Sequence, residues 1–301
     1  MRIGDLSLDG LRTGLQRTGI LFQSGPFRIR FRTAIPHVVG PFRLLYADFD
    51  CLPDSAFSDF RIRIERARGI RRWLRPQATI LFDGRPMFAP FPARLSLAFL
   101  EWGLNWCIAS HVCQFLIVHA AVLERGGRAV MLPGRPGSGK STLCAAMVQQ
   151  GWRLLSDELT LIRPGDGAAV PMPRPISLKN QSIRLVREMA PGAVFGPGCP
   201  TARKGQVAHM RPPVESVEQA SVTARPRWVI FPQYVAGSAT SLADLPKSRA
   251  FLRVAESSFN YSYLGTTGFE TTKRLVDDCE FFSLAYGDLD DALGQITTVC
   301  S

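Results

Sequence analysis

One stretch of the sequence decides the fold class: Ala129-Val130-Met131-Leu132-Pro133-Gly134-Arg135-Pro136-Gly137-Ser138-Gly139-Lys140-Ser141-Thr142. Its first four residues are an apolar run, which is typical of a strand buried on both faces. The run leads into Gly134-x-x-x-x-Gly139-Lys140-Ser141, a complete P-loop pattern. Residues 142–150 then predict a short helix that ends at Gly151. A buried strand, a glycine-rich turn and a helix in this order predict an α/β domain.

The chemistry of this turn is phosphate binding. Glycines let the backbone direct its N–H groups at phosphate oxygens, and the start of the helix adds its positive end. Lys140 is expected to reach the β- and γ-phosphates, and the Ser141 hydroxyl to bind Mg²⁺. We therefore expect ATP and Mg²⁺ as cofactors. The predicted nucleotide-binding residues are Gly134, Arg135, Pro136, Gly137, Ser138, Gly139, Lys140, Ser141 and Thr142.

Two adjacent carboxylates follow in the segment Leu154-Leu155-Ser156-Asp157-Glu158-Leu159. A buried charge without a partner is costly, so Mg²⁺ and a substrate hydroxyl are the natural partners for this pair. Asp157 comes only 17 residues after Lys140, whereas the Mg²⁺-binding acid of most P-loop proteins lies much further along the chain. Asp157, Glu158 and Ser141 are therefore the candidate metal ligands. A pair of capping or turn carboxylates is the alternative.

From His119 to Ile162 the chain resembles the catalytic domain of the HPr kinase/phosphorylase family. That family has a histidine at a strand end, a glycine turn, the P-loop, a short helix ending in glycine, an Arg-Leu step and two acids. The chain is more narrowly similar to the bacterial HPr kinase-related kinase A group. The matching residues are His119, Gly126-Gly127, Gly134 to Thr142, Gly151, Arg153-Leu154 and Asp157-Glu158, then Lys204-Gly205-x-Val207-Ala208-His209, Arg211-Pro212-Pro213, Phe259-Asn260-Tyr261 and Leu264-Gly265.

The resemblance implies the P-loop kinase fold shared with bacterial phosphoenolpyruvate carboxykinase. It implies ATP-dependent phosphorylation of a hydroxyl, with Asp157 as the base, Glu158 assisting Mg²⁺, and Lys140 and His119 as further catalytic residues. It also suggests a serine of a peptide or small protein as acceptor. Three departures argue against HPr itself as substrate and against the reverse phosphorylase reaction. Glu158 stands in place of Asp, Thr142 stands in place of an acid, and the Glu-x-Arg-Gly string is missing.

Gly, Pro and basic residues dominate between Pro191 and Pro213, which predicts a long, mobile loop. Its basic side chains are candidates for a lid that closes over the γ-phosphate, and a solvated basic loop is the alternative. Asn260 is a candidate substrate contact, with packing as the equal alternative. The lid or substrate candidates are Arg203, Lys204, His209, Arg211 and Asn260.

The first 112 residues predict a small α+β domain that precedes a kinase domain over residues 113–301. Residues 27–32 and 60–65 alternate apolar and charged side chains, as strands with one solvated face do. Asp83-Gly84 is a hairpin signal, and a helix is expected over residues 93–110, with Trp102 and Trp106 in the core. Four polar residues interrupt the apolar run 95–118, so we expect a buried helix that runs into a strand rather than a membrane span.

Composition limits the remaining options. The net charge of +11 is spread over the 301 residues, with one arginine cluster over residues 61–75 that we expect to be a solvated face. No nucleic-acid reader motif accompanies it, so neither nucleic acid nor a membrane is an expected partner. Seven cysteines without a C-x-x-C pair, and no apolar segment after Arg2, favour reduced thiols and a cytoplasmic location.

The expected partner is a hydroxyl-bearing acceptor: a peptide, a small protein or a small molecule. Two alternatives to a protein or peptide kinase stay open at this point. One is a small-molecule kinase that acts on a sugar or amino acid, and the other is a non-catalytic NTP-binding regulatory module. Self-association also stays open.

Overall fold

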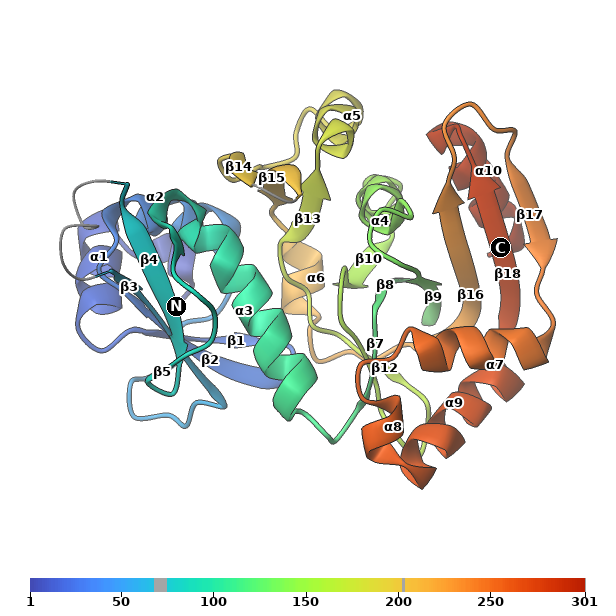
Figure 1. Ribbon diagram of the computed structural model, residues 1–301, viewed down its shortest axis with the longest axis horizontal. Coiled ribbons are helices and arrows are strands. Elements are labelled where there is room, and N and C mark those ends of the chain that lie inside the picture. Colours follow the sequence, from blue (N-terminus) through green and yellow to red (C-terminus); the bar gives the residue numbers. More distant parts are fainter. Residues whose placement is uncertain (68–74, 202–203, 301) are drawn as a thin grey trace.

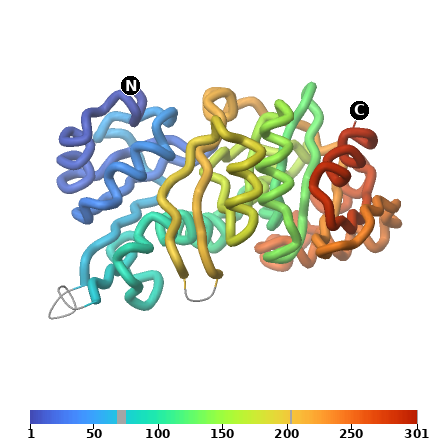
Figure 2. Tube along the Cα trace, turned by 90° about the horizontal axis from the view of Figure 1, so that it is seen from above, coloured from blue at the N-terminus to red at the C-terminus, as the bar shows by residue number. Residues whose placement is uncertain are grey.

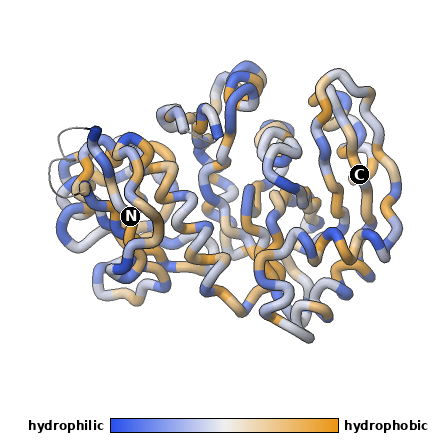
Figure 3. The backbone as a smooth tube through the Cα atoms, in the orientation of Figure 1, coloured by the Kyte–Doolittle hydropathy of each residue, from blue (hydrophilic) through white to orange (hydrophobic). Residues whose placement is uncertain are grey.

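The computed structural model describes residues 1–67, 75–201 and 204–300 of the chain, which form a mixed α/β structure (Figure 1). Within these residues the strands form four sheets. Hydrophobic residues are frequent along the strands (Figure 3). The structure therefore confirms the α/β class.

The N-terminal part is a six-stranded sheet covered by helices. Its order is β1-β2-β3-β4-β5, with β6 paired to β4. Among the described strand pairs of this sheet, β2–β3 is parallel and the others are antiparallel. The predicted alternation is confirmed, because every second residue of β2 is buried. Its elements are η1 (Ile3–Asp5), α1 (Leu8–Gln16), β1 (Ile20–Ser24), β2 (Phe27–Thr33), α2 (Pro36–Leu45), β3 (Phe60–Arg66), β4 (Gln77–Phe82), β5 (Arg85–Pro86), β6 (Phe91–Pro92), η3 (Ala93–Leu95) and α3 (Ser96–His111).

Local sequence signals in this part are also confirmed. Asp83 and Gly84 have φ of 45° and 81°, and they form the turn between β4 and β5. Helix α3 is followed by the buried strand β7 (Leu116–Val118), as the apolar run predicts. No helix among the described residues is long and apolar enough to cross a membrane. The arginine cluster is only partly described, because Arg68, Arg71 and Arg72 lie outside the described residues.

The central sheet carries the segment with the P-loop pattern, Gly134 to Ser141, which is called the phosphate loop from here on. Its order is β10-β8-β9-β16-β18-β17, and β9, β16 and β18 run parallel. The loop follows the carboxyl end of β9, which is where open parallel sheets bind ligands. Helices α4 and α10 pack on one face, and α7 and α9 on the other. The elements are β8 (Ala120–Arg125), β9 (Arg128–Pro133), α4 (Lys140–Gln149), β10 (Arg153–Ser156), β16 (Arg225–Tyr234), β17 (Ser241–Asp244), α7 (Lys247–Glu256), α9 (Thr266–Asp278), β18 (Glu280–Tyr286) and α10 (Leu289–Val299).

Two three-stranded sheets complete the fold. One is β12 (Ala169–Val170), β11 (Thr160–Ile162) and β7. The other is β13 (Ile176–Lys179), β15 (Gly205–Met210) and β14 (Cys199–Thr201), and it lies between α3 and α4 (Figures 1 and 2). Three short helices accompany them: α5 (Gln181–Met189), α6 (Val214–Glu218) and α8 (Tyr261–Leu264).

The prediction of a long, mobile loop between Pro191 and Pro213 is wrong, because regular strands occupy part of this segment. Strands β14 and β15 lie in this segment and pair as an antiparallel hairpin. Gly205, with φ of +65°, closes the hairpin, and the Lys204 backbone N–H donates to Thr201 Oγ1 at 2.9 Å. Gly205 therefore begins β15 and Pro200 lies within β14, so these residue types do not mark one long loop here.

The N-terminal part shares its core with the strands that follow it. Ile117, Leu159 and Met172 belong to the same hydrophobic cluster as the N-terminal sheet. A Cβ atom on Gly25 would lie 2.1 Å from the carbonyl oxygen of Pro171, so the two backbones approach closely. The small sheet β12-β11-β7 is therefore held against the N-terminal part.

Candidate active site

The phosphate loop between β9 and α4 has a backbone that only glycine fits well. Gly137 and Gly139 have φ of +90° and +92°, where other residues are strained. A Cβ atom on Gly139 would lie 1.9 Å from Tyr286 Oη, and that hydroxyl donates to the Gly139 carbonyl at 3.3 Å. The Tyr234 N–H donates to the Ser138 carbonyl at 3.1 Å. Strands β16 and β18 thus support the loop from one side.

Lys140 begins α4 and is buried with its ammonium group inside the loop. Its Nζ donates to the Gly134 carbonyl at 2.5 Å and the Arg135 carbonyl at 3.2 Å, and it lies 3.4 Å from His119 Nε2. Burial lowers the pKa of Lys140 to about 8, against the opposing charges of Asp157 and Glu158. The Lys140 ammonium therefore lies inside the loop that carries the P-loop pattern.

His119, between β7 and β8, bridges Lys140 and the acidic pair. Its Nδ1 lies 3.1 Å from the Glu158 backbone carbonyl, which only accepts hydrogen bonds, so Nδ1 carries the hydrogen. Nε2 is then free to accept from Lys140. Burial and the neighbouring Lys140 charge lower the pKa of His119, consistent with a neutral ring.

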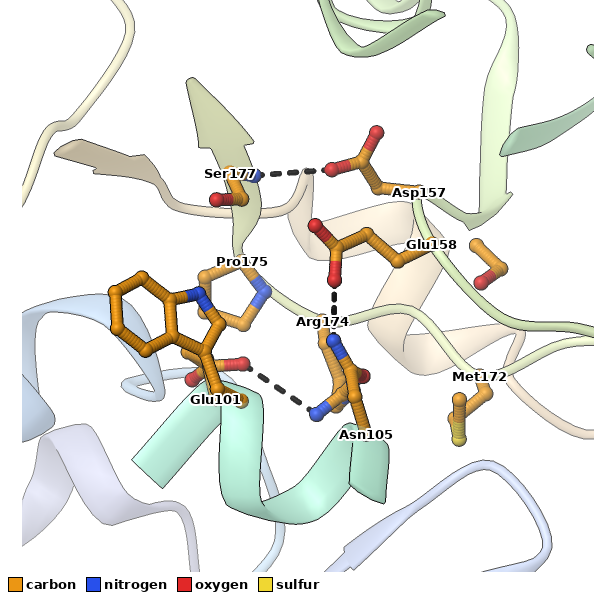
Figure 4. Close-up of a pocket in the computed structure, with 10 residues that line it drawn as sticks. Glu101, Asn105, Asp157, Glu158, Met172, Arg174, Pro175 and Ser177 are labelled. Atoms are coloured by element: carbon orange, nitrogen blue, oxygen red, sulfur yellow. Dashed lines mark hydrogen bonds and ion pairs between the residues drawn. The ribbon is translucent and has the colours of Figure 1, made fainter. Parts of the chain in front are cut away.

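Asp157 and Glu158 follow the end of β10 at Ser156, and both line one cavity (Figure 4). Asp157 Oδ2 accepts from Ser141 Oγ at 3.2 Å and from the Ser177 N–H at 3.0 Å. Asp157 Oδ1 is buried and has no partner among the described residues. Burial, and then the charge of Glu158, raise the pKa of Asp157 to about 6. This unpaired oxygen beside the P-loop serine is a natural place for a cation.

The donor set fits a Mg²⁺ ion that arrives with a nucleotide. Among the described residues, no group of three or more His, Cys, Asp or Glu side chains is placed to hold a metal ion. Mg²⁺ in nucleotide sites commonly uses one or two carboxylates together with phosphate oxygens and water. Ser141 and Asp157, with Glu158 beside them, match that requirement.

The cavity is shared with the N-terminal part through helix α3. Asn105 on α3 donates to the Glu158 carboxylate, and Arg174 donates to Asn105 Oδ1. Arg174 also pairs with Glu101 at 3.4 Å, and Glu101 accepts from the buried Tyr46 hydroxyl. Figure 4 shows the contacts of Asn105 with Glu158 and of Arg174 with Glu101 below the acidic pair. The cavity is lined by Glu101, Trp102, Asn105, Ser156, Asp157, Glu158, Met172, Arg174, Pro175 and Ser177.

No motif in the sequence marks Glu101, Asn105 or Arg174 as functional residues. The spacing of Glu101 and Asn105 could have indicated a shared role, because two residues four positions apart lie on the same face of a helix that is otherwise largely apolar. The expectation that both tryptophans of this helix lie in the core is wrong. Trp102 lines the cavity and Trp106 is 41% exposed, because α3 faces the cavity and solvent as well as the core.

Of the residues predicted to form a lid or to contact the substrate, Lys204 and His209 lie near residues that line the cavity. Lys204 Nζ lies 4.1 Å from the centroid of the Trp102 ring, and burial lowers the pKa of Lys204. His209 is buried opposite Ser177 in the β13–β15 pair, and its Nε2 has no partner among the described residues. The structure therefore brings Lys204 and His209 to the edge of the cavity.

Two other candidates are held by structural contacts. Arg211 pairs with Asp48 at 2.5 Å and ties the end of β15 to the N-terminal part. The Asn260 side chain is buried and bonds the backbones of Val112, Phe115 and Ile117. These contacts support the packing alternative for Asn260. Arg203 lies outside the described residues.

Comparison with known proteins adds no assignment. No protein-family model matches the chain, and a search of curated proteins found no match. The function therefore has to be inferred from the residues of the site and from the motifs that the chain carries.

Proposed function

We propose that the chain is an ATP- and Mg²⁺-dependent kinase that transfers the γ-phosphoryl group to a hydroxyl, most simply a serine of a peptide or small protein. One observation carries the proposal: the hydroxyl of the P-loop Ser141 lies 3.2 Å from the carboxylate of Asp157, which lines one cavity together with Glu158. The P-loop positions the phosphates, and the acidic pair faces the place of transfer.

The fold proposed with this activity is the P-loop kinase fold of the HPr kinase and phosphoenolpyruvate carboxykinase type, over residues 113–301. The phosphate loop at the carboxyl end of a parallel strand supports it. So does the motif resemblance from His119 to Ile162. In this proposal the N-terminal part contributes α3 to the acceptor side of the site.

Each side chain has a role in the proposed transfer. Lys140 and the loop N–H groups bind phosphate oxygens, and neutral His119 orients Lys140 by accepting from its ammonium group. Bound Mg²⁺ would neutralise charge on the phosphates, with Ser141 and Asp157 as its protein ligands. The contact of Asp157 with Ser141 favours Asp157 on the metal side and Glu158 on the acceptor side. The family resemblance favours the opposite assignment, with Asp157 as the base for the acceptor and Glu158 assisting Mg²⁺.

The transfer itself exchanges one P–O bond for another. The acceptor oxygen forms a bond to the γ-phosphorus as the bond to the bridging ADP oxygen breaks. The acceptor proton passes to a carboxylate of the acidic pair. Phosphoryl transfer needs positioning and positive charge more than covalent assistance, and Lys140 supplies that charge.

The test is transfer from γ-labelled ATP to a cell lysate, with identification of the labelled acceptor by mass. Asp157→Asn should abolish labelling, while Asp9→Asn, an exposed acid far from the loop in sequence, should not. Label on a sugar or amino acid would identify a small-molecule kinase. A nucleotide-dependent rise of the melting temperature without any transfer would identify a non-catalytic module. Absence of both would remove the proposal.

A further inference from the structure

The chain uses lysine sparingly, and its lysines are unevenly placed. Only five of its 36 basic residues are lysines. Lys247 and Lys273 lie far along the chain on α7 and α9, where both contact Asp277. Of the other three, Lys140 begins α4, Lys179 ends β13, and Lys204 contacts the ring of Trp102, which lines the cavity. Lysine presents a compact ammonium that binds phosphate oxygens as a point charge, whereas arginine forms a planar fork.

Lys179, at the end of β13, is held beside the start of the phosphate-loop helix. Two residues before it, the Ser177 N–H donates to Asp157 at 3.0 Å. Three residues after it, Ser182 Oγ accepts from Thr142 Oγ1 at 2.8 Å. Both contacts join the β13–α5 segment to the phosphate-binding side of the site, so the backbone of Lys179 is fixed there from both directions.

The side chain of Lys179 lies on the cavity face of β13. Ile176 and Leu178 belong to the core that includes α4. Because successive strand residues point to opposite faces, Ser177 and Lys179 share the other face. Ser177 lines the cavity of the acidic pair, and its partner in the β13–β15 register is His209.

Lys179 is half-buried, and no hydrogen bond or ion pair to its ammonium is found within the described ranges of the chain. Other shielded cations near the site have carboxylate partners, such as Arg174 with Glu101 and Arg211 with Asp48. The Lys179 charge also helps lower the pKa values of His119, Lys140, Lys204 and His209. This side of the site is therefore electropositive and suited to an anion.

We propose that Lys179 binds the γ-phosphoryl group of ATP from the side opposite the phosphate loop, so that the site distinguishes ATP from ADP. The inference rests on the proposed function and names one further phosphate-binding residue for it. ADP lacks the group that Lys179 contacts, so the contact is lost when the phosphoryl group has been transferred. Lys179 thus favours substrate binding over product binding.

Calorimetric titration with Mg²⁺-ADP and with a non-hydrolysable Mg²⁺-ATP analogue tests this assignment. Lys179→Met should weaken binding of the analogue by about tenfold or more, the scale of a lost charged hydrogen bond. Binding of ADP should stay within about twofold of wild type. Lys179→Arg, which keeps the charge, should recover part of the loss. The matched control Lys273→Met, on the exposed surface of α9, should change neither affinity.

The outcomes separate the two proposals. Equal losses of ADP and analogue binding would overturn the assignment, because a merely structural role of Lys179 would affect both. Unchanged binding of both would also overturn it and would leave Lys179 to an anionic group of the acceptor. If wild type binds neither nucleotide, the proposed function itself fails. Melting temperatures without nucleotide establish that each variant is folded.

Discussion

Asn105 on helix α3 donates a hydrogen bond to the carboxylate of Glu158, which lies 53 residues further along the chain. The same side chain accepts from Arg174, whose other partner is Glu101. The N-terminal part therefore contacts the acidic pair directly through one amide group. In the proposed kinase, this contact sets the direction of Glu158 on the acceptor side.

Replacement of Asn105 by Leu tests that role. Glu158 would lose its donor, so we expect the phosphoryl transfer rate to fall about tenfold while the affinity for ATP stays near wild type. Arg174 would lose an acceptor in a buried site, which should lower the free energy of unfolding by about 1–3 kcal/mol. Asn105→Asp keeps the acceptor for Arg174 but places a second negative charge beside Glu158. Wild-type transfer rates in both variants would contradict a positioning role.

The two acids are separated by metal titrations of the transfer rate. If Asp157 binds Mg²⁺ together with Ser141, Asp157→Asn should be partly rescued at high Mg²⁺ concentration. Glu158→Gln should lose about 10²-fold in rate without rescue, as expected for a lost base. If high Mg²⁺ rescues only Glu158→Gln, then Glu158 assists the metal and Asp157 is the base, as the family resemblance implies. No rate change in either variant would exclude the pair from the chemistry.

Local signals predicted the parts of the site that depend on neighbouring residues in the sequence. The strand, turn and helix around Gly134 to Ser141 lie within one short segment, so their geometry follows from local backbone preferences. The contact of Ser141 with Asp157 could also be anticipated, because the acidic pair follows the next strand. The turn at Asp83 and the helix before β7 are local in the same sense.

The remaining features depend on contacts between distant segments. Nothing in the α3 sequence alone shows that Asn105 meets Glu158, since that contact requires the N-terminal part to pack on β7 and β11. The sequence did not predict the β14–β15 hairpin, because glycines and prolines are typical of loops and because the last four residues of β15, from Val207 to Met210, are all buried and show no alternation. Lys179 carried no motif, and its position follows from the pairing of β13 with β15.

Two glycines of the phosphate loop should respond differently to the same substitution. Gly137 and Gly139 have nearly equal positive φ, so alanine costs each about 1 kcal/mol in backbone strain. Open space surrounds Gly137, whereas a Cβ atom on Gly139 meets Tyr286 Oη at 1.9 Å. Gly139→Ala should therefore lower the free energy of unfolding more than Gly137→Ala, as measured by urea denaturation. Equal losses would show that Tyr286 moves aside without cost.

The stability of the fold at acid pH depends on two buried groups, His209 and Asp157, whose pKa values shift in opposite directions on folding. Burial lowers the pKa of His209 to about 4 from 6.5, and burial raises the pKa of Asp157 to about 6 from 3.8. As the pH falls from 6.5 to 4, unfolded chains protonate His209 before folded ones do, so this residue lowers the stability. As the pH falls from 6 to 3.8, folded chains protonate Asp157 first, so that residue raises the stability.

Single substitutions should separate these opposing contributions. Relative to wild type, His209→Gln should become more stable between pH 6.5 and 4, by up to about 3 kcal/mol at the acid end. Asp157→Asn should instead become less stable relative to wild type between pH 6 and 4, because it removes the favourable protonation. Urea unfolding at pH 6.5, 5.5 and 4.5 measures both differences. A difference from wild type that stays constant over this range would show that the replaced group does not change its pKa on folding.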